Sequence, residues 1–176
     1  MFEICDTDKW VATGIYASGF AYYNKQLKGK TAFATQIISK TLPEFRKLLN
    51  IPKDVVFRIA PIKGKALGRY NSNDKVAVID PRQDFFSLLN CIAHELVHAE
   101  QYHENRLDIT YVRGKGYLHM WNGDKINNKG TTYKAYRNQP WEIEAFSRQA
   151  SLAEKVSDAL DLQTTSLYVY KYLIDL

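Results

Sequence analysis

Two histidines and a glutamate in the segment "HELVH" have the residue types and the spacing of a metal site. His94 and His98 stand four residues apart, and Glu95 directly follows the first of them. On an α-helix, which turns about 100° per residue, side chains four apart lie about 40° from each other on one face. Both imidazoles can therefore bind one zinc ion, which in catalytic sites takes three protein ligands and a water. Glu95 projects from the edge of that face and is the predicted general base acting on this water.

The surrounding residues place this motif on a buried helix. Apolar residues recur at helical spacing through the segment, at Phe85, Leu88, Leu89, Ile92, Ala93, Leu96 and Val97. An alternative is that the two histidines only form hydrogen bonds to backbone groups, but a predicted strand hairpin directly before the helix favours the metal. Cys91 falls on the same stripe, and we interpret it as a core cysteine. His103 is rotated away from the proposed metal and is predicted to lie at the surface.

A third ligand must come from another part of the chain. The metzincin pattern is disfavoured, because Gln101 and Glu104 stand where that pattern needs glycine and histidine. Better candidates are Glu142 and Glu144 in "PWEIEAF", because a carboxylate from a second helix completes a zinc site of two histidines and one glutamate. Only one of them is expected to bind, since residues two apart on a helix point about 200° from each other. His119 is a less favoured candidate for the ligand.

The first half of the chain predicts the elements before the motif. Residues 54–62 indicate a strand, and residues 66–70 and 75–80 indicate two more, joined in a hairpin by "NSND". A helix is predicted from near Thr31, with an interruption around "TLPEF", where Thr41 is the expected N-cap of a continuation to Asn50. Residues 10–24 fit either a strand or a helix.

The second half predicts the elements that carry the third ligand. Residues 109–125 look extended, with a turn at Asn122-Gly123. Residues 136–160 indicate a second long helix with Pro140 in its first turn. The last residues, 164–176, fit either a helix or a strand packed on the body.

The composition is that of a soluble globular protein. At 176 residues the chain is long enough for one domain and short for two. We expect a single domain, with a motif-bearing core over about residues 55–150 and residues 1–52 packed on it. Two distant cysteines, no signal peptide and no apolar stretch of membrane-spanning length indicate a cytoplasmic protein without a membrane partner. The net charge of +5 makes nucleic acid a possible partner, but the basic residues are scattered, so none is indicated.

Taken together, these motifs resemble the zincin metallopeptidases, and specifically small gluzincin-like metallopeptidases of phages and bacteria. The resemblance rests on "ALGRY", "VAVID", "LLNCIAHELVHAEQY", "WNGDK" and "YRNQPWEIEAF". The chain is also similar, more loosely, to SprT-like and ImmA/IrrE-like domains. The resemblance implies an α+β, zincin-like fold, in which a small twisted mixed β-sheet packs on the HExxH helix and on a second long helix towards the C-terminus.

The resemblance also implies roles for individual residues. The first glutamate of the E-x-x-A segment, Glu142, is implied to be the third ligand, with Ala145 at the matching small position. Several gluzincins have an aspartate four residues after this ligand to orient a histidine, and here Phe146 takes its place. This departure leaves the support of the histidines unidentified and keeps Glu144 as the alternative ligand. The strand at residues 66–70 is implied to hold an extended peptide substrate by backbone pairing.

The expected function is therefore zinc-dependent hydrolysis of peptide bonds in a protein or peptide substrate. One alternative is a zincin-fold binding or regulatory protein that keeps the metal and cleaves nothing. Another is a protease that acts on DNA-bound proteins, which the basic pI near 9.1 favours but which the lack of a zinc ribbon or basic tail disfavours. Tyr117, Tyr133 and Tyr136 are candidate donors to the oxyanion of the transition state, and the sequence does not choose among them.

Overall fold

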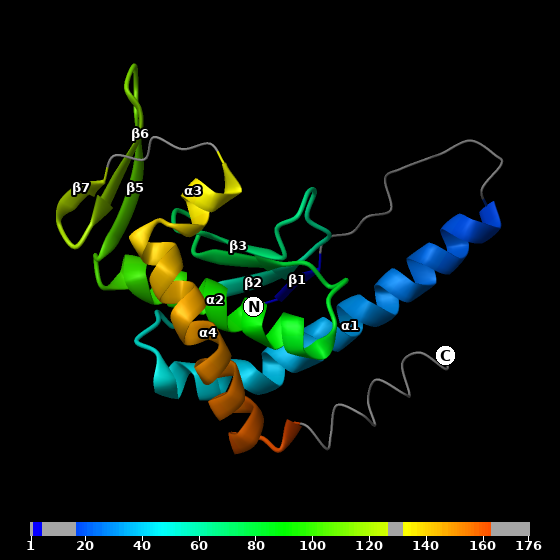
Figure 1. Cartoon of the computed structure of the whole chain (residues 1–176). Coiled ribbons are helices and arrows are strands. Elements are labelled where there is room, and N and C mark those ends of the chain that lie inside the picture. The colour runs from blue at the N-terminus through cyan, green and yellow to red at the C-terminus, as the bar shows by residue number, and fades with distance from the viewer. Residues whose placement is uncertain (1, 5–16, 127–131, 163–176) are drawn as a thin grey trace.

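The structure, a computed structural model, describes residues 2–4, 17–126 and 132–162, with side chains from residue 26 onward. Its elements are β1 (Phe2–Ile4), α1 (Ala17–Leu48), β2 (Val56–Ile59), β3 (Gly68–Asn71), β4 (Val76–Ile79), α2 (Phe85–His103), β5 (Leu107–Val112), β6 (Gly116–Trp121), β7 (Asp124–Ile126), α3 (Tyr133–Arg137) and α4 (Pro140–Ala159). Helices and strands are both prominent and partly segregated along the chain (Figure 1). The fold class is therefore α+β, as the sequence predicts.

A mixed four-stranded sheet, which we call the main sheet, has the strand order β1-β2-β4-β3. Strands β1, β2 and β4 run parallel, and β3 is antiparallel to β4. The predicted hairpin of β3 and β4 is confirmed, with Lys75 at positive φ in its turn. Since β3 is the last strand in this order, one of its edges is free of pairing within the described part of the chain.

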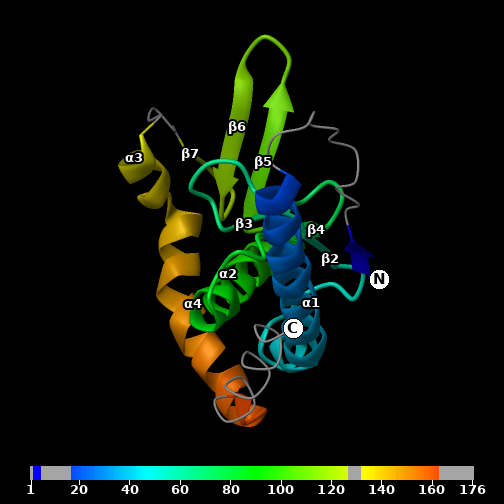
Figure 2. The ribbon, with the colours of Figure 1, turned by 90° about the vertical axis from the view of Figure 1, so that its right-hand side faces the viewer.

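Strands β5, β6 and β7 form a second, antiparallel sheet, which we call the hairpin sheet. The predicted turn between β6 and β7 is confirmed, because both Asn122 and Gly123 have positive φ, as a tight hairpin turn requires. The two views in Figures 1 and 2 show β5 and β6 projecting away from the three long helices. The segment that the sequence predicts to be extended is thus a separate small sheet.

Helix α1 is longer and more continuous than the sequence predicts. It passes through Pro43 without a break, whereas the sequence predicts a start near Thr31 and an interruption at residues 41–45. Thr41 is not an N-cap, because it is buried and its hydroxyl donates a hydrogen bond to the carbonyl of Ile37 (2.8 Å). The buried apolar residues of this helix are Phe33, Ala34, Ile37, Ile38 and Phe45. Burial of this continuous face outweighs the roughly 3 kcal/mol that a proline inside a helix costs.

The second long helix begins later than the sequence predicts. Residues 136–160 were expected to form one helix, but the chain forms the short α3 and then α4, with Asn138 and Gln139 between them. Pro140 is the first residue of α4, as predicted, and Gln139 caps it in an extended conformation. The break has a local cause, because a residue that precedes proline disfavours the helical conformation.

One hydrophobic core joins the main sheet to the long helices. Phe45 of α1, Phe57 of β2, Ile79 of β4, Leu96 of α2 and Val156 of α4 all belong to it and are almost completely buried. Helix α2 lies at its centre, in contact with α1, α4, β3 and β4 (Figure 2). The polar residues of the motif are therefore held in the best-packed part of the molecule.

Two predictions fall partly or wholly outside the described residues. The terminal segment 164–176 lies outside them, and so does the first part of the aromatic segment 10–24, whose remainder belongs to α1. Among the helices described, none is both long and apolar enough to cross a membrane.

Candidate metal centre

Helix α2 presents the motif from a rigid and buried position. Asp84 caps the helix, and its carboxylate accepts hydrogen bonds from the backbone N–H and the hydroxyl of Ser87 (2.9 and 2.6 Å). Ten residues further on, His94, Glu95 and His98 are 8%, 4% and 7% exposed. Burying three polar groups together is unfavourable unless each finds a partner, so their partners define what the site can do.

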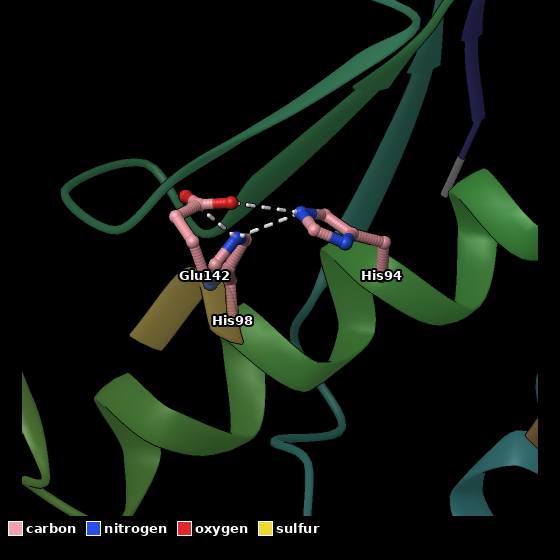
Figure 3. Close-up of side chains that lie close together, drawn as sticks. All are labelled: His94, His98 and Glu142. Atoms are coloured by element: carbon pink, nitrogen blue, oxygen red, sulfur yellow. Dashed lines mark hydrogen bonds and ion pairs between the residues drawn. The ribbon is translucent and has the colours of Figure 1, made fainter. Parts of the chain in front are cut away.

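The two histidines meet a carboxylate from α4 (Figure 3). The Nε2 atoms of His94 and His98 lie 3.2 Å apart. Glu142, in the first turn of α4, places Oε2 3.3 Å from Nε2 of His94 and Oε1 3.3 Å from Nε2 of His98. We call His94, His98 and Glu142 the metal cluster, since they are the described residues whose ligand atoms could hold one ion together.

The spacing of these atoms fits a small tetrahedral ion. Ligands at tetrahedral corners about 2.0 to 2.1 Å from zinc lie about 3.3 to 3.4 Å from one another. The observed separations are close to that spacing: the two Nε2 atoms lie 3.2 Å apart, and each lies 3.3 Å from one of the two oxygens of Glu142. The donor set of two imidazoles and one carboxylate is also that of a catalytic zinc site, which leaves one corner open.

Hydrogen bonds to two glutamines orient the imidazoles. Nδ1 of His98 lies 2.9 Å from Oε1 of Gln101, and Nδ1 of His94 lies 3.0 Å from Oε1 of Gln149. Since an amide oxygen only accepts, each Nδ1 carries the hydrogen, and each neutral ring turns a lone pair of Nε2 towards the cluster. The amide of Gln101 is itself fixed, because its Nε2 donates to the carbonyl of Trp141 (3.1 Å).

The metal cluster consequently lacks a cation of its own. Two Nε2 lone pairs and a carboxylate face one another, and Oε2 of Glu142 is buried without a hydrogen-bond donor among the described residues. Burial raises the pKa of Glu142, but hydrogen bonds from His94 and His98, which form only when their Nε2 atoms carry a proton in place of a metal ion, and from Tyr136 outweigh it and lower the pKa to about 2. The carboxylate therefore stays charged, and a bound cation would balance it.

Glu95 lies beside the cluster but is not part of it. Burial raises the pKa of Glu95 above its usual range, and the negative charge of Glu142 adds to this, while positive charge on His98 or His94 acts in the opposite direction. The backbone N–H of Tyr70, in β3, donates a hydrogen bond to its carboxylate. A glutamate with a raised pKa next to a metal site is suited to accept and return a proton.

Gly68, also in β3, packs directly against this glutamate. A Cβ atom at position 68 would lie 2.6 Å from Oε1 of Glu95 and 2.6 Å from Sγ of Cys91. Only glycine allows the strand to come this close, so strand β3 fixes the position of Glu95. Cys91 is buried, as predicted, and burial raises the pKa of its thiol.

Glu144, the alternative ligand, points to the other side of α4. Its carboxylate pairs with Arg106 through both oxygens (2.5 and 3.1 Å) and with Arg148 (2.7 Å). Arg148 also contacts Glu100 of α2 (2.5 Å), which accepts a hydrogen bond from the backbone N–H of Asn50. We call Glu100, Arg106, Glu144 and Arg148 the arginine network. The structure thus brings Glu142, and not Glu144, to the two histidines.

The other two histidines lie away from the metal cluster. His103, the last residue of α2, is exposed, as predicted. His119 of β6 stacks on the ring of Trp141, with centroids 5.6 Å apart and planes at 10°. Since Trp141 directly precedes Glu142 and holds Gln101 through its carbonyl, His119 supports the site at a distance and is not brought to it.

Gln101 and Gln149 are the site residues that the sequence analysis missed. Phe146 stands at the position where the resemblance would place an aspartate to orient a histidine. Its ring packs on His94, with centroids 4.5 Å apart. Gln149, three residues later on α4, bonds to His94 from the next turn of the helix. Gln101 stands three residues after His98, and this helical spacing was the one available sequence signal.

The three candidate tyrosines differ in their positions. The Tyr136 hydroxyl forms a hydrogen bond to the carboxylate of Glu142. Tyr133 is 68% exposed, and Tyr117, also 68% exposed, pairs with Tyr111 across the hairpin sheet. Only Tyr136 is therefore in contact with the metal cluster among these three.

The geometry of the site is the main guide to the function of this protein, because the comparisons with known proteins do not indicate a function. Compared with protein-family models, with curated proteins and with solved structures, the chain gives no match.

Proposed function

We propose that the protein is a zinc-dependent metallopeptidase with a zincin-like fold. The observation that carries this proposal is the spacing of the metal cluster, with the two Nε2 atoms 3.2 Å apart, each 3.3 Å from an oxygen of Glu142, and Glu95 buried beside them. The mixed main sheet, packed on α2 with β3 at its edge, supports the same proposal. Zinc hydrolases combine two histidines, one carboxylate ligand and one glutamate that does not bind the metal.

In this proposal His94, His98 and Glu142 hold the metal. When bound, zinc would supply a Lewis acid that polarises the substrate carbonyl and makes the attacking water more acidic. Glu95 takes the proton from that water and delivers it to the nitrogen of the leaving amine. Its raised pKa suits both steps, because the carboxyl group must accept a proton and then release it.

Strand β3 and Tyr136 complete the proposed machinery. An extended peptide that pairs with the free edge of β3 lies next to Glu95, because Gly68 contacts that side chain. On the opposite side, the Tyr136 hydroxyl bonds to Glu142. We assign it as the donor that stabilises the oxyanion of the transition state.

The substitution Glu95→Gln tests the proposal. It keeps the shape of the side chain and removes its ability to accept a proton. We expect zinc content to stay at one ion per chain and peptide cleavage to fall by at least about 10²- to 10⁴-fold, the usual contribution of a general base. Metal analysis and a quenched-fluorescence peptide library measure the two quantities on the same sample.

Glu144→Gln is the matched control, since it makes the same chemical change two residues from a proposed ligand. We expect it to keep both zinc and cleavage. Undiminished cleavage by the Glu95→Gln protein would contradict the assigned base, and a wild-type protein without zinc would contradict the proposal as a whole. Full zinc content with no cleavage across the library would instead indicate a binding or regulatory protein.

A further inference from the structure

Arg137 lies on the rim of the metal cluster and has no role in the mechanism above. It is the last residue of α3 and is exposed. Helix α3 is tied to α4 by hydrogen bonds from the backbone N–H of Gln139 to the carbonyl of Tyr136 (3.0 Å) and from Ile143 to Gln139 (2.9 Å). Helix α3 therefore lies directly before the start of α4 (Figure 1).

A stack of three side chains connects Arg137 to His94. The Cζ atom of Arg137 lies 3.7 Å from the centre of the Phe146 ring. The same ring packs on His94, with centroids 4.5 Å apart and planes at 55°. A cation over an aromatic face is stabilised by the ring, and a guanidinium in this position keeps the N–H groups along its edge available for other partners.

The carboxylates nearest to Arg137 in the sequence of α4 have other partners. Glu142 faces the two histidines, and Glu144 is held by Arg106 and Arg148. In the part of the chain that the structure describes, no carboxylate forms an ion pair with Arg137. The rim of the metal cluster thus presents an oriented positive charge to solvent.

We propose that Arg137 forms a subsite for a carboxylate of the substrate. An extended peptide advances about 3.3 to 3.6 Å per residue, so a guanidinium joined to His94 through a single aromatic ring lies within the reach of a few residues on either side of the bond to be cut. The carboxylate belongs either to an acidic side chain at that position or to the C-terminus of a short peptide. This inference rests on the proposed function, because it takes the metal cluster as the place of cleavage.

The test uses a set of quenched-fluorescent decapeptides of one common sequence. One arm places a single glutamate in turn at each position, with glutamine there in the matched peptide and an amidated C-terminus throughout. The second arm has no acidic side chain and compares free with amidated C-termini on peptides shortened from that end. Cleavage rates are measured with the zinc-loaded wild-type protein, and affinities with the zinc-loaded Glu95→Gln protein, which binds without cutting.

We expect about a tenfold preference for a carboxylate at one position, as a charge-assisted bidentate hydrogen bond provides. The arm that shows it identifies the source of the carboxylate. Arg137→Gln should reduce the preference to about one, and Arg137→Lys should keep part of it. Arg113→Gln, which removes the same charge from the exposed turn of the hairpin sheet, should leave the preference unchanged.

The outcomes separate this inference from the proposed function. The subsite is overturned if the unsubstituted protein binds and cleaves all peptides equally well, or if a preference persists in Arg137→Gln. Both outcomes count whether or not cleavage occurs. A preference in binding that depends on Arg137, in a wild-type protein that cuts nothing, supports the subsite and contradicts the peptidase. Absence of both binding and cleavage overturns the two together.

Discussion

The metal cluster and the arginine network lie at the same interface between α2 and α4, but the negative charge of their carboxylates is balanced in different ways. Each contains a glutamate from α4, and Glu142 and Glu144 are only two residues apart. In the arginine network every carboxylate meets a guanidinium, which is a permanent cation. In the metal cluster the carboxylate meets two imidazoles whose hydrogens point away, towards Gln101 and Gln149.

The difference shows how one helix interface can hold both a structural and a functional site. Direction on the helix, and not residue type, decides which glutamate receives which partner, because positions two apart face opposite ways. The arginine network is complete within the chain, and Glu144 has a pKa lowered, against burial, by its arginines. In the metal cluster, under the proposed function, a bound cation would supply that balance.

Glu142→Gln should abolish zinc binding, because it removes one of three ligands and the only charged one. We expect a loss of affinity larger than the roughly 10- to 100-fold that removing a hydrogen-bond partner of a ligand costs. Competition with a chromophoric chelator measures the affinity. Glu144→Gln provides the comparison and should bind zinc as the wild type does; equal losses in both variants would contradict the contrast.

Removing the metal from the wild type should lower its stability. A ligand at a free concentration a thousandfold above its Kd stabilises the folded state by about 4 kcal/mol, which corresponds to about 10 °C in Tm for a chain of this size. Thermal unfolding with and without a chelator measures the shift. The Glu142→Gln protein should show none, and a chelator effect of equal size in that variant would place the metal elsewhere.

Gln149→Ala should weaken zinc binding by about 10- to 100-fold, because His94 loses the acceptor that fixes its tautomer and orientation. Gln149→Glu should restore most of the affinity, since a carboxylate also accepts the Nδ1 hydrogen. The chelator competition described above measures both variants. An unchanged affinity in Gln149→Ala would mean that Phe146 alone orients the ring.

Arg148→Met should reduce the free energy of unfolding by about 1 to 2 kcal/mol and leave zinc affinity unchanged. The substitution leaves Glu100 buried with one fewer cation, although the partial exposure of Arg148 moderates the cost. Urea denaturation measures the change in the free energy of unfolding. A change in zinc affinity would show that the two sites are coupled and not merely adjacent.

Sequence alone predicted the parts of this site that depend on local pattern. The spacing of His94 and His98 and the apolar stripe around them predict a helix with one polar side, and the strands within residues 56–79 follow from their own alternation. The choice between Glu142 and Glu144 could not be made from the residues alone. Spacing gives the angle between two side chains on one helix, but it does not give the rotation of α4 relative to α2.

The missed features are those that depend on distant contacts. Gln149 follows His94 by 55 residues. No sequence pattern shows whether the amide of a helical glutamine forms a hydrogen bond inside the protein or faces solvent. The predicted break in α1 was wrong for a related reason. A proline is a local signal against the helix, and the burial that overrides it comes from the main sheet and the other helices.

The position of the hairpin sheet has a consequence for how the molecule can vary. Strands β5 to β7 belong entirely to the segment that leaves α2 and returns to α4, so a metal held by both helices closes this segment into a loop. The entropy of closing a loop grows slowly, by about 0.6 kcal/mol for each doubling of its length. The tip of the hairpin between β5 and β6 is therefore the place where insertions, deletions or a grafted recognition element should be tolerated, because a metal bound as proposed would hold the two ends of the segment together.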